Sequence, residues 1–278
     1  MISVVDWVRQ QFPEVSWDGA EATHGAFHDV VVGRQVVARV GIDDACLRAE
    51  HATWGSWRSV ELPVAVPPLL SSVRSDDDRS GYLVARLPGS PAERAPWATV
   101  RETFADLLAA LRSVEVRTLA LPPVRTWCGG ARFPEIVREE LAPLLAAHAD
   151  DRVAALAVDA VDRMIALGSD GSPVLVHGDL GPHNLLWEDA GRDGGRATGL
   201  IDLDHAAITD QVVDLAPLVG FYGARAVREI APADEVERAV SYRATLPLQV
   251  AAAAHLRGAI SLRDHALGNA IRRITATT

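Results

Sequence analysis

Hydrophobic residues follow two different periods along the chain, and the change between them near residue 88 separates a strand-rich part from a helical part. Valines recur through 29–33 and 36–40 on either side of a short polar turn, which predicts a hairpin. Apolar residues at helical spacing within 3–11, preceded by Ser3 as a cap, predict an amphipathic helix before the hairpin. The first part of the chain therefore combines antiparallel strands with helical cover.

The same reading continues to the end of the chain. A helix is expected at 43–59, and two strands at 69–73 and 81–85 enclose the acidic turn 76–79. Pro88 and Gly89 then mark a boundary, because both residues interrupt regular structure. Apolar residues three and four apart predict helices at 96–114, 134–147, 151–167 and from 210 onward, and a loop is expected at 119–131. The pattern indicates an α+β fold.

One segment, 174–204, carries polar residues that buried strands would hold together. Three short runs of Val, Leu and Ile predict strands, the second at 184–187 and the third at 198–203 with a turn at 188–196 between them. The octet HGDLGPHN lies between the first two runs. The octet contains Asp179 and Asn184, and Asp202 closes the third run. Asp179 can accept a proton, while Asn184 and Asp202 offer the hard oxygen ligands that suit Mg²⁺. Phosphoryl transfer needs this combination of a group that orients a hydroxyl and oxygens that hold a metal.

These residues resemble the catalytic loop of kinases, in which an Asp and an Asn stand at the same offset. HGDLGPHN followed by IDLD resembles the aminoglycoside phosphotransferase and choline kinase superfamily of small-molecule kinases. The resemblance implies a bilobal protein-kinase-like fold. In it, 1–87 would be a small nucleotide-binding lobe with an antiparallel sheet and a helix, and 88–278 a larger, mainly helical catalytic and substrate-binding lobe.

The resemblance also implies a role for individual residues. It assigns catalysis to Asp179, metal binding to Asn184 and Asp202, nucleotide binding to Gly25, Phe27, His28, Arg39, Glu50, Ala85 and Leu87, acceptor binding to Trp127, Glu140 and Asp204, and structural support to His177 and Asp214. The chain has no lysine, so Arg39 takes the position of the usual phosphate-contacting lysine. Glu50 is either the ion-pair partner of Arg39 or part of a surface ion pair. Asp204 either faces a cationic acceptor or caps a loop.

Composition and charge limit the classes of molecule that the protein is expected to bind. The net charge of -10 disfavours nucleic acid and anionic membranes and suits a cationic small molecule. Cys46 and Cys128 lack the spacing of a metal site, which indicates two reduced thiols. Without a secretory leader or a long apolar stretch, a cytoplasmic protein is expected, as a monomer or homodimer.

The function that the resemblance implies is transfer of phosphate from ATP (or GTP), with Mg²⁺, to a hydroxyl of a cationic antibiotic, which inactivates the antibiotic. AFHDVVVG and HGDLGPHNLLWE are similar to phosphotransferases that act on the tuberactinomycin peptides viomycin and capreomycin. Aminoglycosides, macrolides, choline and homoserine stay open as acceptors. Two other classes also stay open: a nucleotide-binding scaffold, and a metallohydrolase with ligands from His177, Asp179, His183, Asp202, Asp204 and His205.

Overall fold

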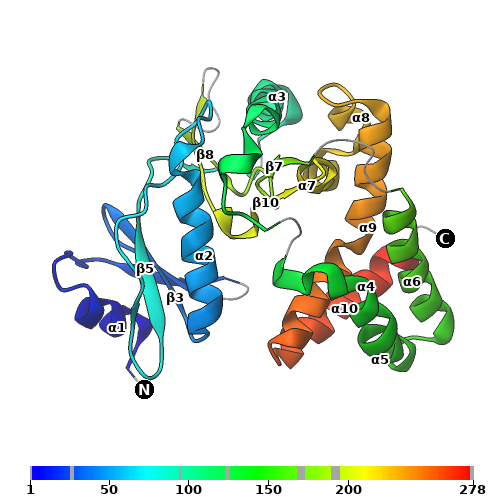
Figure 1. The fold of residues 1–278 in the computed structure, drawn as a ribbon, viewed down its shortest axis with the longest axis horizontal. Coiled ribbons are helices and arrows are strands. Elements are labelled where there is room, and N and C mark those ends of the chain that lie inside the picture. The colour runs from blue at the N-terminus through cyan, green and yellow to red at the C-terminus, as the bar shows by residue number, and fades with distance from the viewer. Residues whose placement is uncertain are drawn as a thin grey trace. The chain divides into compact units, whose positions relative to one another are not determined.

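A computed structural model describes residues 2–25, 28–93, 95–122, 126–167, 173–188 and 195–275, and the chain divides into two compact units (Figure 1). The first unit contains Met1–Ala95, Thr118–Ala120 and Pro182–Asp204, and the second contains Pro96–Arg117, Leu121–Gly181 and His205–Thr278. The functional division into lobes 1–87 and 88–278 stays a prediction. The structure adds that 182–204, far along the chain, packs with the N-terminal residues.

An antiparallel sheet with strand order β1-β2-β3-β5-β4 forms the centre of the first unit. Its strands are β1 (Glu21–His24), β2 (Asp29–Val32), β3 (Val36–Gly41), β4 (Arg74–Ser75) and β5 (Ser80–Ala85). The hairpin expected at 29–40 is confirmed by the pairing of β2 with β3. The expected strand at 69–73 is wrong, because the Ser71 hydroxyl accepts the N–H of Leu83 at 2.9 Å, and only Leu69 forms a bridge to Val84.

The two faces of this sheet are covered by different helices. Helix α1 (Val4–Gln11), capped by Ser3, packs Trp7 and Phe12 against Ala38 and Leu83. Helix α2 (Asp44–Ser56) packs on β3 and β5, and it lies beside them in Figure 1. Because side chains alternate along a strand, Arg39 points to the face opposite Ala38, which is the face that α2 covers.

The first unit also contains a three-stranded sheet of β6 (Ser90–Pro91), β8 (Leu185–Glu188) and β9 (Arg196–Leu200), in the order β6-β8-β9. Strand β9 was expected to continue to residue 203, but it ends at Leu200. Most of the turn expected at 188–196 lies outside the described residues. The β8–β9 ribbon confirms the strand-turn-strand arrangement predicted for this segment.

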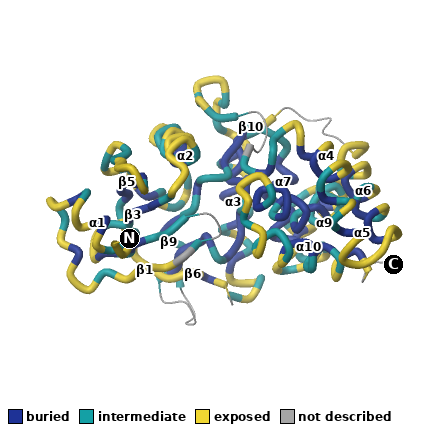
Figure 2. The backbone as a smooth tube through the Cα atoms, turned by 90° about the horizontal axis from the view of Figure 1, so that it is seen from below, coloured by how far each residue is buried: buried dark blue, intermediate teal, exposed yellow. Residues whose placement is uncertain are grey.

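The second unit is mainly helical. Its helices are α3 (Trp97–Ser113), α4 (Phe133–Ile136), α5 (Ala142–His148), α6 (Asp151–Ala166), α7 (Val212–Tyr222), α8 (Ala224–Val227), α9 (Ala233–Leu256) and α10 (Ile260–Thr275), and strands β7 (Val174–Val176) and β10 (Ala207–Thr209) pair antiparallel. Helix α9 packs against α6, α7 and α10. Ala251 to Ala254 are fully buried, and α7 is mostly dark blue in Figure 2. No helix of the described residues is both long and apolar enough to cross a membrane.

Two expected helices differ in detail. The helix expected at 134–147 is interrupted by a π-helical turn, Val137–Leu141, in which the N–H of Ala142 donates to the carbonyl of Val137. Pro143 explains the interruption, because proline has no N–H for the carbonyl of Glu139. The C-terminal helical stretch breaks at Gly258, whose φ of 67° ends α9 in the way common for glycine.

Candidate active site

The candidate catalytic aspartate belongs to the second unit, where buried hydrogen bonds fix the backbone around it. Asp214, in the first turn of α7, is fully buried and accepts the N–H groups of His177 at 2.8 Å and Gly178 at 2.7 Å. The ring nitrogen Nδ1 of buried His177 accepts the N–H of Asp179 at 3.2 Å. Buried polar groups need such partners, so these bonds determine the course of the loop that carries Asp179.

Gly178 is required by its surroundings. Its φ of 90° lies in the left-handed region that side chains disfavour, and a Cβ atom there would collide with the backbone carbonyl of His205. Protein kinases have an arginine at this point of their catalytic loop. The close approach of the 205 backbone explains why this chain has glycine instead.

The candidate metal ligands belong to the first unit and are carried by the β8–β9 ribbon. Asn184 immediately precedes β8, and Asp202 follows β9 by two residues, so antiparallel pairing brings both to one end of the ribbon. The N–H of Ile201 donates to the carbonyl of Asn184 at 2.9 Å and closes this end. Asp202 has a φ of 65°, an uncommon conformation for a residue other than glycine that is often found at functional sites.

Arg39 lies beside Asp202 in the same unit. Its side chain is 7% exposed, and its guanidinium donates to Oδ1 of Asp202 at 3.1 Å and to Oδ2 of Asp204. Burial by itself would lower the pKa of Arg39, but Tyr82, Asp202 and Glu50 more than offset this and raise it. Arg39 is therefore a buried, permanently charged cation at the metal-ligand end of the ribbon.

Asp204 is also contacted from α2. The indole N–H of Trp54 donates to its Oδ1 at 2.7 Å, and the guanidinium of Arg39 lies 5.5 Å from the centre of the Trp54 ring. Glu50 and His28 are close as well, since each has a ligand-type atom within 4.8 Å of the Asp204 carboxylate. The sequence does not predict these contacts: Trp54 has no local signal, and Asp204 is expected to contact the acceptor, to cap a loop or, in the metallohydrolase alternative, to bind a metal.

The remaining nucleotide-site predictions lie in the β1–β2 turn and at the end of β5 in the first unit. Gly25 donates its N–H to the carbonyl of His28 at 2.9 Å, which closes the β1–β2 turn, whereas Phe27 lies outside the described residues. Ala85 donates its N–H to Pro68 at 2.9 Å. Leu87 packs against Gly199 of β9, where a Cβ atom would lie 2.5 Å from Cδ1 of the leucine.

Two residues predicted to bind the acceptor, Glu140 and Trp127, contact the C-terminal end of α9 in the second unit. Glu140, on the π-helical turn, lies 2.8 Å from Nε2 of His255, near the C-terminus of α9. The carbonyl of Trp127 accepts a hydrogen bond from Arg257 at 3.1 Å, and the Trp127 ring stacks on His205 at 4.7 Å. The structure thus brings two residues that are 13 positions apart in the chain to one region.

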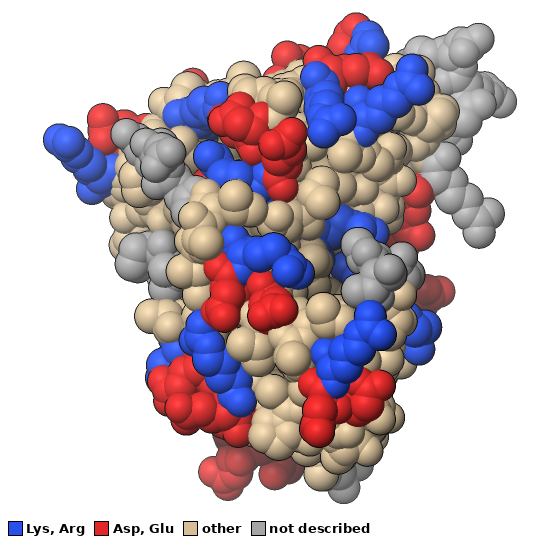
Figure 3. Space-filling view, turned by 90° about the vertical axis from the view of Figure 1, so that its right-hand side faces the viewer, with Lys and Arg blue, Asp and Glu red and all other residues tan. Residues whose placement is uncertain are grey.

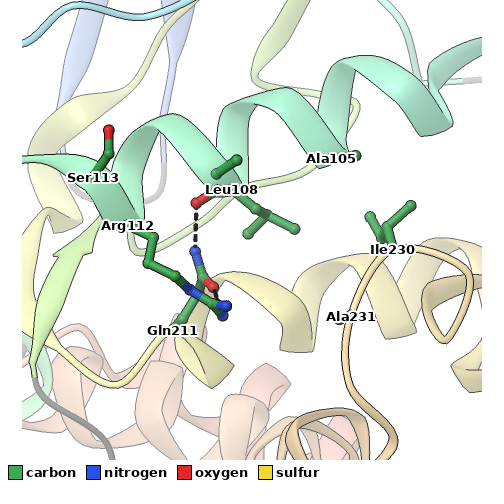
Figure 4. A pocket seen from close by; sticks show the side chains of 8 residues that line it. Ala105, Leu108, Arg112, Ser113, Gln211, Ile230 and Ala231 are labelled. Carbon is green, nitrogen blue, oxygen red and sulfur yellow. Dashed lines mark hydrogen bonds between the residues drawn. The ribbon is translucent and has the colours of Figure 1, made fainter.

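A cavity of about 330 Å³ in the second unit is separate from these residues (Figure 4). Buried Gln211 donates to the carbonyl of Leu108 at 2.8 Å and accepts from Arg112, which also binds Glu235 at 2.9 Å. The polar groups on this wall join α3 to the start of α7, and these bonds account for the burial of Gln211 without a ligand.

On the face shown in Figure 3, arginines and acidic residues are interspersed. Many arginines form ion pairs with acids, including Arg101 with Glu229 at 3.3 Å and Arg228 with Glu237 at 3.9 Å. Among the described residues visible on this face, basic side chains are thus mixed with acidic ones and form no continuous stripe.

Three comparisons connect this architecture to known proteins. A family model described as "Phosphotransferase enzyme family" matches residues 43–251. Viomycin phosphotransferase from Streptomyces vinaceus is 31% identical over 271 residues, which cover 88% of this chain and 90% of that protein.

Solved structures of similar fold include the GDP complex of wild-type aminoglycoside 2'-phosphotransferase-IIIa, with a TM-score of 0.77, 16% identity, and coverage of 98% of this chain and 97% of the other. A ternary complex of aminoglycoside phosphotransferase APH(4)-Ia with ADP and hygromycin B has a TM-score of 0.67, 17% identity, and coverage of 99% and 98%. These likenesses confirm the predicted bilobal, kinase-like α+β fold.

Proposed function

The chain belongs to the phosphotransferase enzyme family, and we propose that it transfers the terminal phosphate of ATP or GTP to a hydroxyl group of a small cationic antibiotic. The observation that carries the proposal is the end of the β8–β9 ribbon, where Asn184 and Asp202 are adjacent and the Arg39 guanidinium contacts Asp202 at 3.1 Å. Family membership leaves no role for the metallohydrolase alternative.

The residues of this ribbon end fit a magnesium ion. Asn184 and Asp202 offer the neutral and anionic oxygens that Mg²⁺ accepts, and the guanidinium on Asp202 shows that the site stabilises positive charge. When bound, magnesium would neutralise charge on the phosphates and fix their geometry. Arg39 would balance the charge of the phosphates that are not transferred, and its planar fork can bind two phosphate oxygens at once.

Asp179 is the proposed base. It would orient the acceptor hydroxyl and take its proton late, because the transition state of phosphoryl transfer is loose and needs little activation of the nucleophile. Asp214 and His177 hold the backbone on both sides of Gly178. Their role is therefore to keep the Asp179 carboxylate in one position.

Ala85 to Leu87 are proposed to contact the base of the nucleotide. The N–H groups of Ala85 and Arg86 already donate to Pro68 and Gln35, each at 2.9 Å. Recognition of the base by this stretch would therefore use carbonyl groups and the backbone of Leu87. This pattern does not select between adenine and guanine, so both nucleotides belong in the test.

The acceptor is proposed to be a tuberactinomycin peptide. The support is the 31% identity to a viomycin phosphotransferase, together with the net charge of -10, which favours a strongly cationic substrate. Glu140 and Trp127 are proposed to line its binding site, since both lie at the C-terminal end of α9. Aminoglycosides are the second candidate, because the neighbours of similar fold include aminoglycoside phosphotransferases.

The test is a matrix of ATP and GTP against viomycin, capreomycin, kanamycin, hygromycin B, a macrolide, choline and homoserine. Each reaction is followed by nucleotide consumption and by mass spectrometry of the acceptor. We expect nucleotide-dependent addition of one phosphate to viomycin or capreomycin, with a higher kcat/KM than for any other acceptor. Preference for an aminoglycoside or amino alcohol would replace the proposed acceptor. Nucleotide binding without turnover of any acceptor would favour the scaffold alternative.

A further inference from the structure

We infer that Asp204, rather than Glu50, is the acid that positions Arg39 for the nucleotide phosphates. The inference rests on the proposed function and concerns the same site. Kinase-like folds place the partner acid of the phosphate-contacting cation on the helix that packs against the sheet, which here is α2 with Glu50. In this chain the Arg39 guanidinium donates hydrogen bonds to Asp202 and also to Asp204, the acid two residues beyond the metal ligand.

The contacts of Asp204 hold its carboxylate in a single orientation. One oxygen accepts from the guanidinium of Arg39, and the other accepts from the indole of Trp54 at 2.7 Å. The Asp204 side chain is only 4% exposed and that of Arg39 only 7%, so water screens their attraction little. The Trp54 ring under the guanidinium adds a second contact from the same residue.

Glu50 also acts on Arg39, through its charge. Its charge helps to raise the pKa of Arg39, which places it nearby, but one of its carboxylate oxygens lies 3.6 Å from the thiol of Cys46 on the same helix. Glu50 therefore contributes to the negative surroundings of Arg39, while Asp204 fixes the direction in which the guanidinium points.

The arrangement explains why two acids follow each other so closely in IDLD. Arg39 contacts both Asp202 and Asp204. If Asp202 turns its carboxylate to a metal ion, Arg39 keeps Asp204 and stays in place. Asp202 would bind the metal and Asp204 would hold the arginine, so Asp204 is a positioning residue that acts through Arg39.

The test measures nucleotide binding without any acceptor, so that it does not depend on the acceptor's identity. The dissociation constant of Mg·ATP (or Mg·GTP) is measured by calorimetry for wild type, Asp204→Asn and Glu50→Gln, with the melting temperature of each. We expect Asp204→Asn to weaken binding about ten- to hundredfold, the range for loss of a buried charged hydrogen bond, and Glu50→Gln to weaken it less. Glu14→Gln, which removes the exposed ion pair with Arg74 at 2.6 Å, is the control and should bind as wild type does.

A double-mutant cycle separates positioning from general loss of structure. In the Arg39→Met background, Asp204→Asn should have no further effect on the dissociation constant, because the residue through which Asp204 acts is gone. A further loss similar to that in wild type would overturn the inference, as would a loss for Glu50→Gln equal to or larger than that for Asp204→Asn. Tighter binding by Asp204→Asn would also overturn it, since Asp204 would then be withholding Arg39.

Trp54→Phe keeps the test open if Asp204→Asn fails to fold. Phenylalanine keeps an aromatic ring under Arg39 but lacks the N–H that orients Asp204, so binding should weaken about threefold. An unchanged dissociation constant would count against the inference. Failure of the inference is therefore distinct from failure of the proposed function. The latter would appear as normal nucleotide binding by wild type without phosphorylation of any acceptor.

Discussion

At the scale of single residues, the proposed site depends on side chains whose surroundings leave them little freedom. Asp179 is held through its own N–H by His177, and the two residues before it are held by Asp214. A base held in this way contributes through position and through its charge. The consequences of removing either are therefore different and can be measured separately.

Asp179→Asn keeps the shape of the side chain and removes its ability to take a proton. We expect kcat to fall about 10²- to 10⁴-fold, the usual contribution of a positioned base, while the KM for the nucleotide changes little. Steady-state kinetics with the best acceptor measures both. Asp159→Asn, an exposed aspartate on α6, is the control. Turnover by Asp179→Asn within threefold of the control would remove Asp179 from the mechanism.

Gly178→Ala tests the close approach of the backbone at residue 205. The added Cβ atom would both adopt an unfavourable φ and collide with the His205 carbonyl, so the free energy of unfolding should fall by at least about 2 kcal/mol. Gly258→Ala is a matched control, because Gly258 also has a positive φ, 67°, but has no atom within 4 Å of the Cβ position. Its loss should be about 1 kcal/mol. Urea denaturation of both variants gives the comparison, and equal losses would mean that the collision is relieved.

At the scale of elements, local sequence signals were sufficient where a single residue decides the outcome. Ser3 caps α1 as predicted, since its hydroxyl accepts the N–H of Asp6 at 3.1 Å, and the Asp150 carboxylate caps α6 in the same way through the N–H of Val153 at 2.8 Å. Signals failed where a distant partner decides. The stretch 69–73 has the composition of a strand, yet a serine side chain replaces the backbone acceptor there. The π-helical turn at Val137–Leu141 follows from Pro143, which interrupts the helix that the apolar spacing predicts.

Asp44, in the first turn of α2, joins this helix to β5 and makes the element sensitive to acid. Arg48 foremost, then Ser80 and Ser75, holds the pKa of Asp44 well below its usual value. A carboxyl with a lowered folded-state pKa stabilises the protein above its unfolded value, about 3.9, and this contribution is lost as the pH falls through the folded-state pKa. The stabilisation is therefore fully present at neutral pH.

The melting temperature of Asp44→Asn should lie below that of wild type at pH 7, and the difference should shrink as the pH falls below about 4. Thermal unfolding across this range by circular dichroism measures it. Asp77→Asn, an exposed acid of the turn between β4 and β5, should follow wild type at each pH. A difference between wild type and Asp44→Asn that stays constant with pH would show that the carboxylate charge is not responsible.

At the scale of the whole molecule, the motifs name candidate site residues but do not indicate which distant residues are their neighbours. HGDLGPHN and IDLD make Asp179, Asn184 and Asp202 candidates through their residue types, their spacing and their resemblance to the kinase catalytic loop. The motifs did not reveal that 182–204 packs with the N-terminal unit, nor that Asp204 meets Arg39 and Trp54 there. These contacts join residues more than 100 positions apart, and no periodicity or composition records such a pairing. The likeness to solved structures shows the overall fold, but only the coordinates of this chain show which acids contact Arg39.

Binding of a nucleotide should stabilise the whole protein, and the role of Asp202 can be read from that effect. A ligand at 100 times its dissociation constant adds about 2.7 kcal/mol to the free energy of unfolding, which raises the melting temperature. In wild type, nucleotide with Mg²⁺ should raise it more than nucleotide alone. In Asp202→Ala this magnesium-dependent increment should disappear, because an oxygen ligand is lost, while the increment from nucleotide alone should remain through Arg39 and Asp204. Thermal shift assays with ATP and GTP, each with Mg²⁺ or with EDTA, separate the two. An intact magnesium increment in Asp202→Ala would move the metal site away from the end of the β8–β9 ribbon.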